Sequence, residues 1–360
     1  MGLHELQLRN FRLFKELNFV PDREAVTVLL SPNGTGKTSV LEAVYALATA
    51  ASFRTGAASD MIRTGDQIAE VHGVLYQRER RVQVDLTLTR GVRNTTKRML
   101  VNGQRPLSRG DLAEALPLTI FTPEGVDIVR QGPENRRAFL THLLSDVDIK
   151  TGDVIERFAR ILSQRNALLR GLRGELPSSS QREELEVWSR DFALVSEELV
   201  AIRRSVLAQL TPLVTRYYQE LAHDDLAVGI EYEQSWRGNL FDALERSLDD
   251  DRFRGHTTLG PQRDDVLLTL DGREARRQAS QGEQRSLALA LRLGGHELVQ
   301  QKRGVDPLLL LDDVFSELDP LRSDRLLQLL PAGQTLVTTA SPLPSAMSPA
   351  AVIDLSLSMP

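Results

Sequence analysis

The sequence predicts an α/β fold with a mixed sheet, an antiparallel β subdomain and an inserted helical lobe. Three observations indicate it. An apolar segment at residues 25–30 leads through a glycine-rich turn into a run of good helix formers. Residues 133–222 have apolar positions near a 3.6-residue period, which is typical of helices. The apolar run Pro307–Leu311 ends at two aspartates, as expected of a strand buried on both faces.

The first ~110 residues are rich in predicted strands, and one helix interrupts them. We expect that helix at Thr38–Ala50 because it follows the glycine-rich turn and contains good helix formers. Apolar, β-branched and alternating residues predict strands at Leu3–Leu8, Ala25–Leu30, Val71–Tyr76, Arg81–Thr89 and Met99–Asn102.

The middle of the chain predicts an antiparallel helical hairpin. Pro177–Ser180 interrupts the helical pattern, and a second stretch runs from about Glu183 to Leu221. Pro212 is expected to kink or split that stretch near Thr211, because proline lacks the N–H that a helix interior needs. No internal repeat is found.

The C-terminal part returns to α/β character. We expect strands at Asp265–Leu270, Pro307–Leu311 and Thr335–Thr339, and helices at Glu283–Gln300 and Leu321–Leu330. Residues 1–112 and 260–360 are therefore predicted to form one head, with residues 113–259 as an inserted, mainly helical lobe.

Composition excludes several classes of site. The sequence contains no cysteine, which rules out disulfides and thiolate metal ligands. It has neither an N-terminal signal-peptide pattern nor an apolar run of about 18 residues, so we expect no membrane segment and a cytoplasmic location.

The glycine-rich turn has the pattern of a phosphate-binding loop. Its residues are Ser31, Pro32, Asn33, Gly34, Thr35, Gly36, Lys37, Thr38 and Ser39. A loop between a strand and a helix N-terminus points backbone N–H groups at phosphate oxygens. Lys37 is expected to neutralise the phosphates and Thr38 to coordinate Mg²⁺, so the cofactors would be ATP and Mg²⁺. Ser31 stands where the usual pattern has glycine.

Two further segments support a nucleotide site. Asp312 and Asp313 follow an apolar strand, at the sheet edge where α/β proteins bind ligands, and Asp312 is expected to hold Mg²⁺. Ser280, Gln281, Gly282 and Glu283 precede a helix. Ser280 and Glu283 have capping-box spacing, so a purely structural role is open, as is a second phosphate cradle.

Together these segments resemble those of ABC-type ATPases, with Ser280–Glu283 in the place of the signature motif. The resemblance implies that this motif completes the ATP site of a second copy, in an ATP-dependent homodimer. It implies that Asp313 orients or deprotonates the attacking water, and that Ser316–Asp319 forms the loop that crosses the dimer interface. Gln131 is a candidate Q-loop residue, although a surface glutamine in a turn fits equally well, and no switch histidine can be placed.

Across nearly the full chain, the sequence is similar to the RecF family of bacterial recombination mediators. The shared segments are Asn10–Arg12, Ser31–Ala43, Ser52–Thr55, Ile62–Gly65, Gly132–Pro133 with Arg136–Arg137, Gly260–Asp265, the signature-like motif and Leu308–Asp319. Gln262 stands where the family more often has histidine. The resemblance implies an ABC/SMC-type head and a weak DNA-stimulated ATPase that binds DNA in its ATP-bound dimeric form. It also implies that the protein helps RecO and RecR to load the recombinase RecA.

The charge distribution suggests where DNA would bind. The chain carries a formal net charge of −5, yet Tyr76–Arg109 has nine basic and two acidic residues. Arg90, Arg93, Lys97 and Arg98 are the candidate DNA contacts, although a solvated, solubilising hairpin explains the same composition. A helicase-like P-loop motor and a nucleotide-stabilised adaptor without catalysis are the alternative functions.

Overall fold

The computed structural model describes residues 2–77, 80–106, 114–172, 178–340 and 347–355. The chain forms two compact units. Unit 1 contains residues 1–126, 216–224 and 289–360, and unit 2 contains residues 127–215 and 225–288. Some expected features lie outside the described residues, namely Pro177 of the interruption, the domain boundary at residue 112, and Arg78 and Arg109 of the basic segment. The interruption expected at Pro177–Ser180 is wrong for Ser179 and Ser180, which already belong to a helix.

Unit 1 contains an antiparallel five-stranded sheet with the order β2-β1-β4-β5-β6. Its strands are β1 (Gly2–Phe11), β2 (Phe14–Phe19), β4 (Ile68–Gln77), β5 (Arg80–Arg90) and β6 (Thr95–Val101). Alternate residues of β5, such as Val84, Leu86 and Leu88, are buried. This sheet therefore has one face on the core and one polar face, as its alternating sequence predicts.

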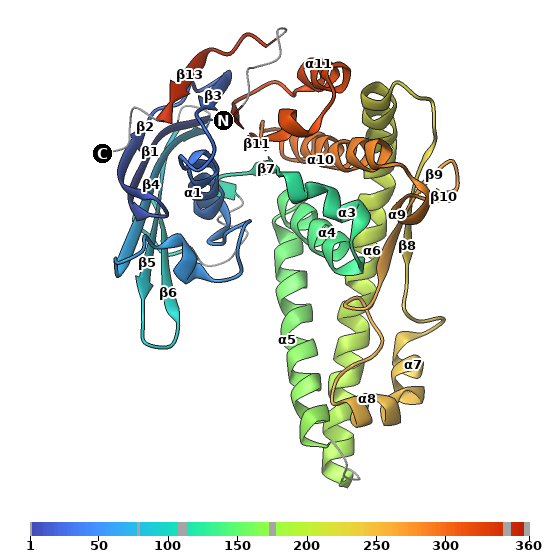
Figure 1. Cartoon of the computed structure of the whole chain (residues 1–360). Helices are drawn as coiled ribbons and strands as arrows, with labels where there is room; N and C mark the ends of the chain where they lie inside the picture. The colour runs from blue at the N-terminus through green and yellow to red at the C-terminus, as the bar shows by residue number, and fades with distance from the viewer. Residues whose placement is uncertain (1, 78–79, 107–113, 173–177, 341–346, 356–360) are drawn as a thin grey trace. The chain divides into compact units, whose positions relative to one another are not determined.

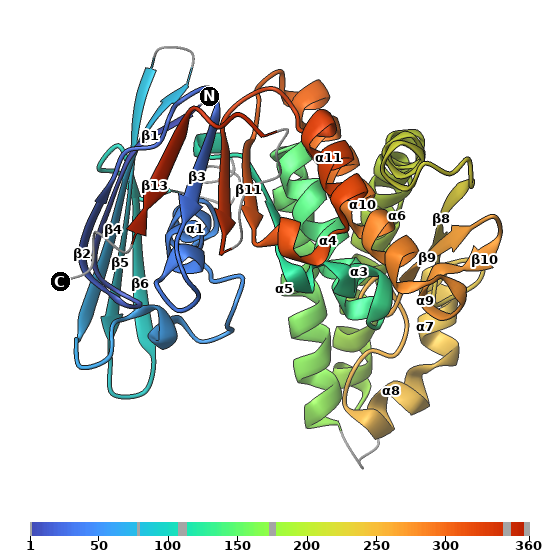
Figure 2. The same cartoon turned by 45° about the horizontal axis from the view of Figure 1, so that its top comes forward.

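The second sheet of unit 1 is parallel and has the order β13-β3-β12-β11-β7. Its strands are β3 (Val26–Leu30), β7 (Leu118–Phe121), β11 (Leu308–Asp312), β12 (Thr335–Thr339) and β13 (Ala351–Asp354). Every residue of β11 and β12 is buried. Helix α1 (Lys37–Thr49) lies between the two sheets, and one apolar core joins all three elements (Figure 2).

Unit 1 also contains shorter helical segments and parts of two long helices. They are η1 (Ala58–Met61), η2 (Pro123–Val126), η3 (Val314–Glu317), α11 (Pro320–Leu329), the part of α10 (Gln281–Arg303) from Leu289 onwards and the end of α6 (Ser179–Ala222) from Arg216 onwards. Asp319 caps α11 by accepting a hydrogen bond from the N–H of Arg322, as an N-cap aspartate should.

Unit 2 is mainly helical. Figure 1 shows the long helices α5 and α6 side by side, as the sequence predicts for this segment. Its helices are α3 (Asp127–Arg130), α4 (Pro133–Val147), α5 (Lys150–Gly171), α6 (Ser179–Ala222) up to Thr215, α7 (Leu240–Arg246), α8 (Leu248–Arg254), α9 (Ala275–Gln278) and the start of α10, up to Ala288. Its strands are β8 (Val228–Glu233), β9 (Asp265–Leu270) and β10 (Arg273–Glu274). The strands form a small antiparallel sheet, β10-β9-β8.

A buried ion pair ties this hairpin to the small helix α8. Arg165 on α5 donates to Asp251 at 2.7 Å and to Thr257, and both charged side chains are fully buried. Phe158 on α5 and Phe192 on α6 pack with ring centroids 5.6 Å apart.

The expected split at Pro212 is wrong: α6 is one helix from Ser179 to Ala222, with Pro212 inside it. Proline costs one hydrogen bond within a helix. The helix continues because its apolar face is buried on both sides of the proline, at Leu210, Val214 and Tyr218, all of which are fully buried. Among the residues that the structure describes, no helix is long and apolar enough to span a membrane.

Candidate nucleotide-binding site

The phosphate-binding loop connects β3 to α1 and has the backbone shape that the sequence predicts. Gly34 and Gly36 have φ values of +85° and +91°, a region that side chains with a Cβ rarely adopt. At Gly36 a Cβ would also lie 2.7 Å from Cζ of Phe14 on β2. Both glycines are therefore required by the geometry of the loop. Helix α1 begins directly after Gly36, so its N-terminus faces the loop.

Lys37 is the first residue of α1, and its side chain turns back towards the start of the loop. Its Nζ donates to the carbonyl of Pro32 at 2.8 Å and to the carbonyl of Ser31. Burial lowers the pKa of Lys37, and the charges of Asp313 and Asp312 oppose this shift. Two carbonyl groups of the loop thus hold the ammonium group.

Asp312 lies at the end of β11 and accepts two hydroxyl hydrogen bonds on one oxygen. Thr38 Oγ1 donates to its Oδ1 at 2.9 Å, and Thr338 Oγ1 on β12 donates at 2.7 Å. Burial is the main cause that raises the pKa of Asp312, and the charge of Asp313 adds to it. The two hydroxyl hydrogen bonds and the charge of Arg54 act in the opposite direction. The sequence-predicted residues of α1 and β11 therefore lie together.

The donor set of Thr38 and Asp312 fits Mg²⁺. This ion prefers oxygen ligands and is commonly bound through one or two carboxylates and substrate phosphates. Burial disfavours the charge on Asp312, and a cation beside it would offset that cost.

Asp313 follows β11 in a left-handed conformation with φ of +49°. Its N–H points at β12, with the carbonyl of Thr338 at 3.1 Å and the Thr338 hydroxyl at 3.0 Å. Its Oδ1 is buried and accepts no hydrogen bond among the described residues. A left-handed conformation costs about 1 kcal/mol for a residue with a Cβ, so the chain holds this carboxylate in a specific orientation at the sheet edge.

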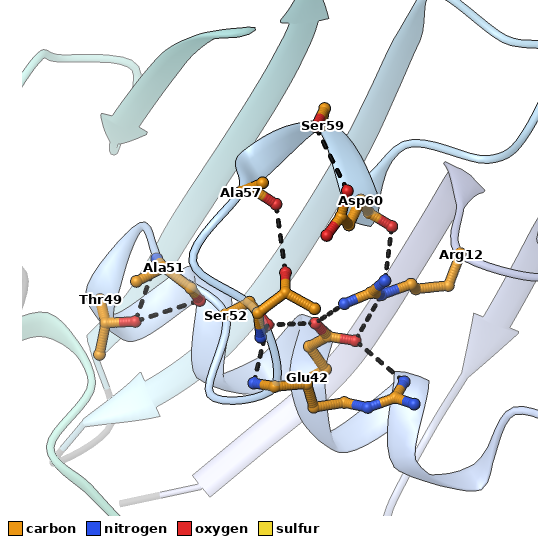
Figure 3. Close-up of polar contacts among 10 residues, drawn as sticks. Arg12, Glu42, Thr49, Ala51, Ser52, Ala57, Ser59 and Asp60 are labelled. Carbon is orange, nitrogen blue, oxygen red and sulfur yellow. Dashed lines mark hydrogen bonds and ion pairs between the residues drawn. The ribbon is translucent and has the colours of Figure 1, made fainter.

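Sequence reasoning missed a polar network around Glu42 on α1, the helix that follows the loop. Glu42 on α1 is fully buried, and Figure 3 shows Arg12 and Ser52 donating to it. Arg54 also pairs with Glu42 at 3.5 Å and lies near enough to Asp312 to lower its pKa. The resemblance includes the segment Ser52–Thr55, but the sequence assigns it no chemistry because its partners are distant in the chain.

The signature-like motif lies in unit 2 and forms the expected capping box. The N–H of Ser280 donates to Glu283 Oε2 at 2.6 Å, and the N–H of Glu283 points at Ser280 Oγ at 3.3 Å. Gln281 and Gly282 begin helix α10. In the same unit, Gln284 is hydrogen-bonded to Arg130 of α3 at 2.9 Å and to the carbonyl of Ala275. Gln131, the Q-loop candidate, follows α3, and its carbonyl accepts from Arg136.

The four candidate DNA contacts lie on the β5–β6 hairpin, on different elements from the phosphate loop. Lys97 donates to the carbonyl of Ala50 at 2.7 Å, and Arg90 donates to the carbonyl of Ser59 at 3.1 Å. These two cations brace the hairpin against the segment after α1. Arg93 at the hairpin turn and Arg98 on β6 have exposed side chains.

The chain matches the family model described as RecF/RecN/SMC N terminal domain over residues 2–343. It is also 34% identical to the DNA replication and repair protein RecF of Acidothermus cellulolyticus, an alignment that covers 95% of this chain and 94% of that one. The chain belongs to the RecF family. The RecF of Streptomyces avermitilis matches with the same identity and coverage.

Solved structures of known proteins also resemble this chain. The recombination mediator protein RecF-ATP of the RecFOR pathway superimposes with a TM-score of 0.86 at 26% identity, over 98% of this chain and 94% of that one. An Smc head bound to the C-terminal winged-helix domain of ScpA matches with a TM-score of 0.53 at 15% identity, over 95% and 90% of the two chains, which supports the fold alone. The predicted ABC/SMC-type head is confirmed.

Proposed function

We propose that this RecF-family protein is an ATP-dependent DNA-binding protein of recombinational repair and replication, and that ATP drives its dimerisation. The observation that carries the proposal is the cluster of Lys37, Thr38 and Asp312 at one sheet edge. The similarity to a RecF structure with ATP supports the choice of nucleotide.

In this proposal the residues of the loop and of the sheet edge bind ATP and hydrolyse it. The loop N–H groups and Lys37 bind the phosphates, with Lys37 exchanging carbonyl partners for phosphate oxygens. Mg²⁺ held by Thr38 and Asp312 would neutralise charge on the phosphates. Asp313 would orient the attacking water and accept its proton. Its Oδ1, which has no hydrogen-bond partner in the described part of the chain, supplies the acceptor.

Dimerisation would follow from the signature-like motif. Ser280 and Gly282 stand at the N-terminus of α10, where N–H groups favour an anion. We propose that this helix end meets the terminal phosphate bound by a second copy. ATP then stabilises the dimer through contacts that ADP lacks, and hydrolysis removes them.

The proposed DNA surface is the β5–β6 hairpin, where Arg93 and Arg98 are exposed. Contact with the phosphate backbone fits this arginine-rich hairpin, because backbone contacts need only positive charge. We further propose that RecO and RecR are its partners in recombinase loading and that DNA stimulates its ATPase. The proposed location is the cytoplasm, and the proposed head consists of residues 1–112 and 260–360.

Sedimentation of a Ser280→Arg variant tests the dimer. It should bind ATP with normal affinity yet sediment as a monomer, since the added side chain blocks the approach of a second copy. Gln301→Arg places the same charge at an exposed position farther along α10 and should dimerise like the unmodified chain. A Ser280→Arg protein that dimerises normally would refute the proposed arrangement.

DNA affinity and ATP turnover, measured on the same samples, distinguish an ATP-dependent DNA clamp from a helicase-like motor and from a non-catalytic adaptor. A clamp should bind DNA more tightly with a non-hydrolysable ATP analogue than with ADP and should hydrolyse ATP slowly. Rapid turnover on single-stranded DNA would favour a motor, and equal DNA affinity in both nucleotides would favour an adaptor.

A further inference from the structure

Ser31, the first residue of the phosphate-binding loop, carries a hydroxyl group without a partner. The residue is 4% exposed, and its Oγ is buried with no hydrogen bond among the described residues. A buried polar group without a hydrogen bond is costly. Its backbone needs no special conformation, because Ser31 is not among the residues with positive φ. The hydroxyl is therefore the feature of this residue that needs an explanation.

The backbone contacts of Ser31 place it at the terminal-phosphate end of the site. Its carbonyl accepts a hydrogen bond from Lys37 Nζ, and the lysine of such a loop reaches the β- and γ-phosphates. Its N–H points at the carbonyl of Thr339 at 3.4 Å, at the end of β12. Ser31 thus lies at the same sheet edge as Asp312 and Asp313.

Asp313 at the same sheet edge helps to decide which ligand group the Ser31 hydroxyl would meet. Asp313 Oδ1 is also buried without a partner in the described structure, and Asp313 and Ser31 flank the end of β12 on opposite sides. An ionised carboxylate only accepts hydrogen bonds, so Asp313 suits a water molecule and repels a phosphate. A hydroxyl has a proton to donate, so Ser31 suits a phosphate oxygen.

We infer that the Ser31 hydroxyl donates a hydrogen bond to the terminal phosphate of a bound nucleoside triphosphate and makes the site prefer triphosphate over diphosphate. The inference rests on the proposed nucleotide site and adds a specificity-determining residue to it. Without nucleotide, the hydroxyl has no partner among the described residues, and the terminal phosphate would give it one. Its contribution therefore appears only in the triphosphate complex.

Calorimetric titration of Ser31→Ala with ATPγS and with ADP, each with Mg²⁺, tests the inference without relying on hydrolysis. Loss of a hydrogen bond to a charged group should weaken ATPγS binding about tenfold. ADP affinity should change by less than about twofold, because ADP lacks the phosphate that the hydroxyl meets. Ser31→Gly should behave in the same way, which guards against an effect of the new methyl group.

Thermal unfolding of the free proteins gives a second readout. Ser31→Ala removes an unpaired buried hydroxyl, so its Tm without nucleotide should equal or exceed that of the unmodified chain. Ser196→Ala removes a hydroxyl that is also fully buried and unpaired among the described residues, but on helix α6 in unit 2. This control should leave both nucleotide affinities unchanged.

The titrations distinguish a failure of the Ser31 inference from a failure of the proposed function. Equal losses for ATPγS and ADP, or no loss for either, would overturn the role of Ser31 while leaving the nucleotide site intact. If the unmodified chain bound neither nucleotide, the proposed function itself would fail.

Discussion

Thr38 donates its hydroxyl proton to Oδ1 of Asp312 at 2.9 Å, across 274 residues of sequence. This hydrogen bond joins the first turn of α1 to the end of β11 and brings together the two residue types that a Mg²⁺–phosphate complex needs. The metal and the phosphates are therefore expected to bind as one unit.

Thr38→Ala should weaken Mg²⁺-dependent ATPγS binding by at least about tenfold, because one oxygen ligand is lost. Thr38→Ser keeps the hydroxyl and should retain most of the affinity. Titrations with Mg²⁺ and with EDTA measure the difference. If Thr38→Ala bound as tightly as Thr38→Ser with Mg²⁺ present, the metal assignment would be wrong.

Asp313→Asn should slow ATP turnover by about 10²-fold or more, because the amide cannot accept the proton of the attacking water. Asparagine also tolerates the left-handed backbone found at this position, so the fold should be preserved. Sedimentation should show a dimer that persists after ATP addition. A variant dimer that dissociated as quickly as the unmodified one would contradict the role of Asp313.

Charge reversal on the hairpin tests the DNA surface. Arg93→Glu and Arg98→Glu should weaken DNA binding and reduce the slope of log affinity against log salt by about 0.9 for each lost phosphate contact. Lys15→Glu makes the same charge change at an exposed position on β2 and serves as the control. Fluorescence anisotropy over a salt series provides the measurement, and an unchanged slope would exclude this surface.

The two arginines on Glu42 should differ in their effect on stability. Arg12 is mostly buried and makes two hydrogen bonds to Glu42, of 2.7 and 2.5 Å. Arg12→Met should therefore lower the free energy of unfolding by about 3 kcal/mol. Arg54 is 44% exposed and lies 3.5 Å from Glu42, so Arg54→Met should cost less than about 1 kcal/mol. Urea denaturation gives both values; equal losses would show that Glu42 depends on both cations alike.

His296 on α10 should make stability depend on pH. Its Nδ1 is 3.1 Å from the Thr119 hydroxyl, and its Nε2 is buried without a partner in the described structure. Burial lowers its pKa from 6.5 to about 4, against the opposing charges of Asp306 and Glu297. The unfolded chain therefore binds this proton first as pH falls. The His296 contribution is fully present above about pH 6.5 and is lost towards pH 4.

The expected loss is about 1 kcal/mol at pH 5.5 and about 3 kcal/mol at pH 4. In urea denaturation over this range, His296→Gln should show a correspondingly flatter pH dependence than the unmodified chain. Parallel curves for the two proteins would mean that His296 does not titrate as its burial implies.

Much of the fold could be predicted because local patterns agree with the tertiary structure. The strands expected at Asp265–Leu270 and Thr335–Thr339 are found with those bounds. Strand β2 is not predicted by the sequence because its burial does not alternate along Phe14–Phe19. The turn before it uses Asn10 and Arg12 with positive φ, and no glycine marks that turn in the sequence.

The nucleotide-binding loop could be predicted from its local sequence alone. Its chemistry requires specific residue types at fixed spacing, so Gly34, Gly36, Lys37 and Thr38 identify it locally. The positions of Arg54 and Thr338 near Asp312 were not predictable, because they depend on how α1, β11 and β12 pack. Neither residue has a neighbour in sequence that reveals its partner.

The closeness of the Phe14 ring to Gly36 has a consequence for how tightly the loop can bind a nucleotide. A residue of β2 limits the space at Gly36, so packing against the antiparallel sheet sets the course of the loop independently of any phosphate. A preorganised loop loses little conformational entropy when a ligand arrives. Enlarging or removing the Phe14 ring should therefore alter nucleotide affinity by changing how well the loop is preorganised.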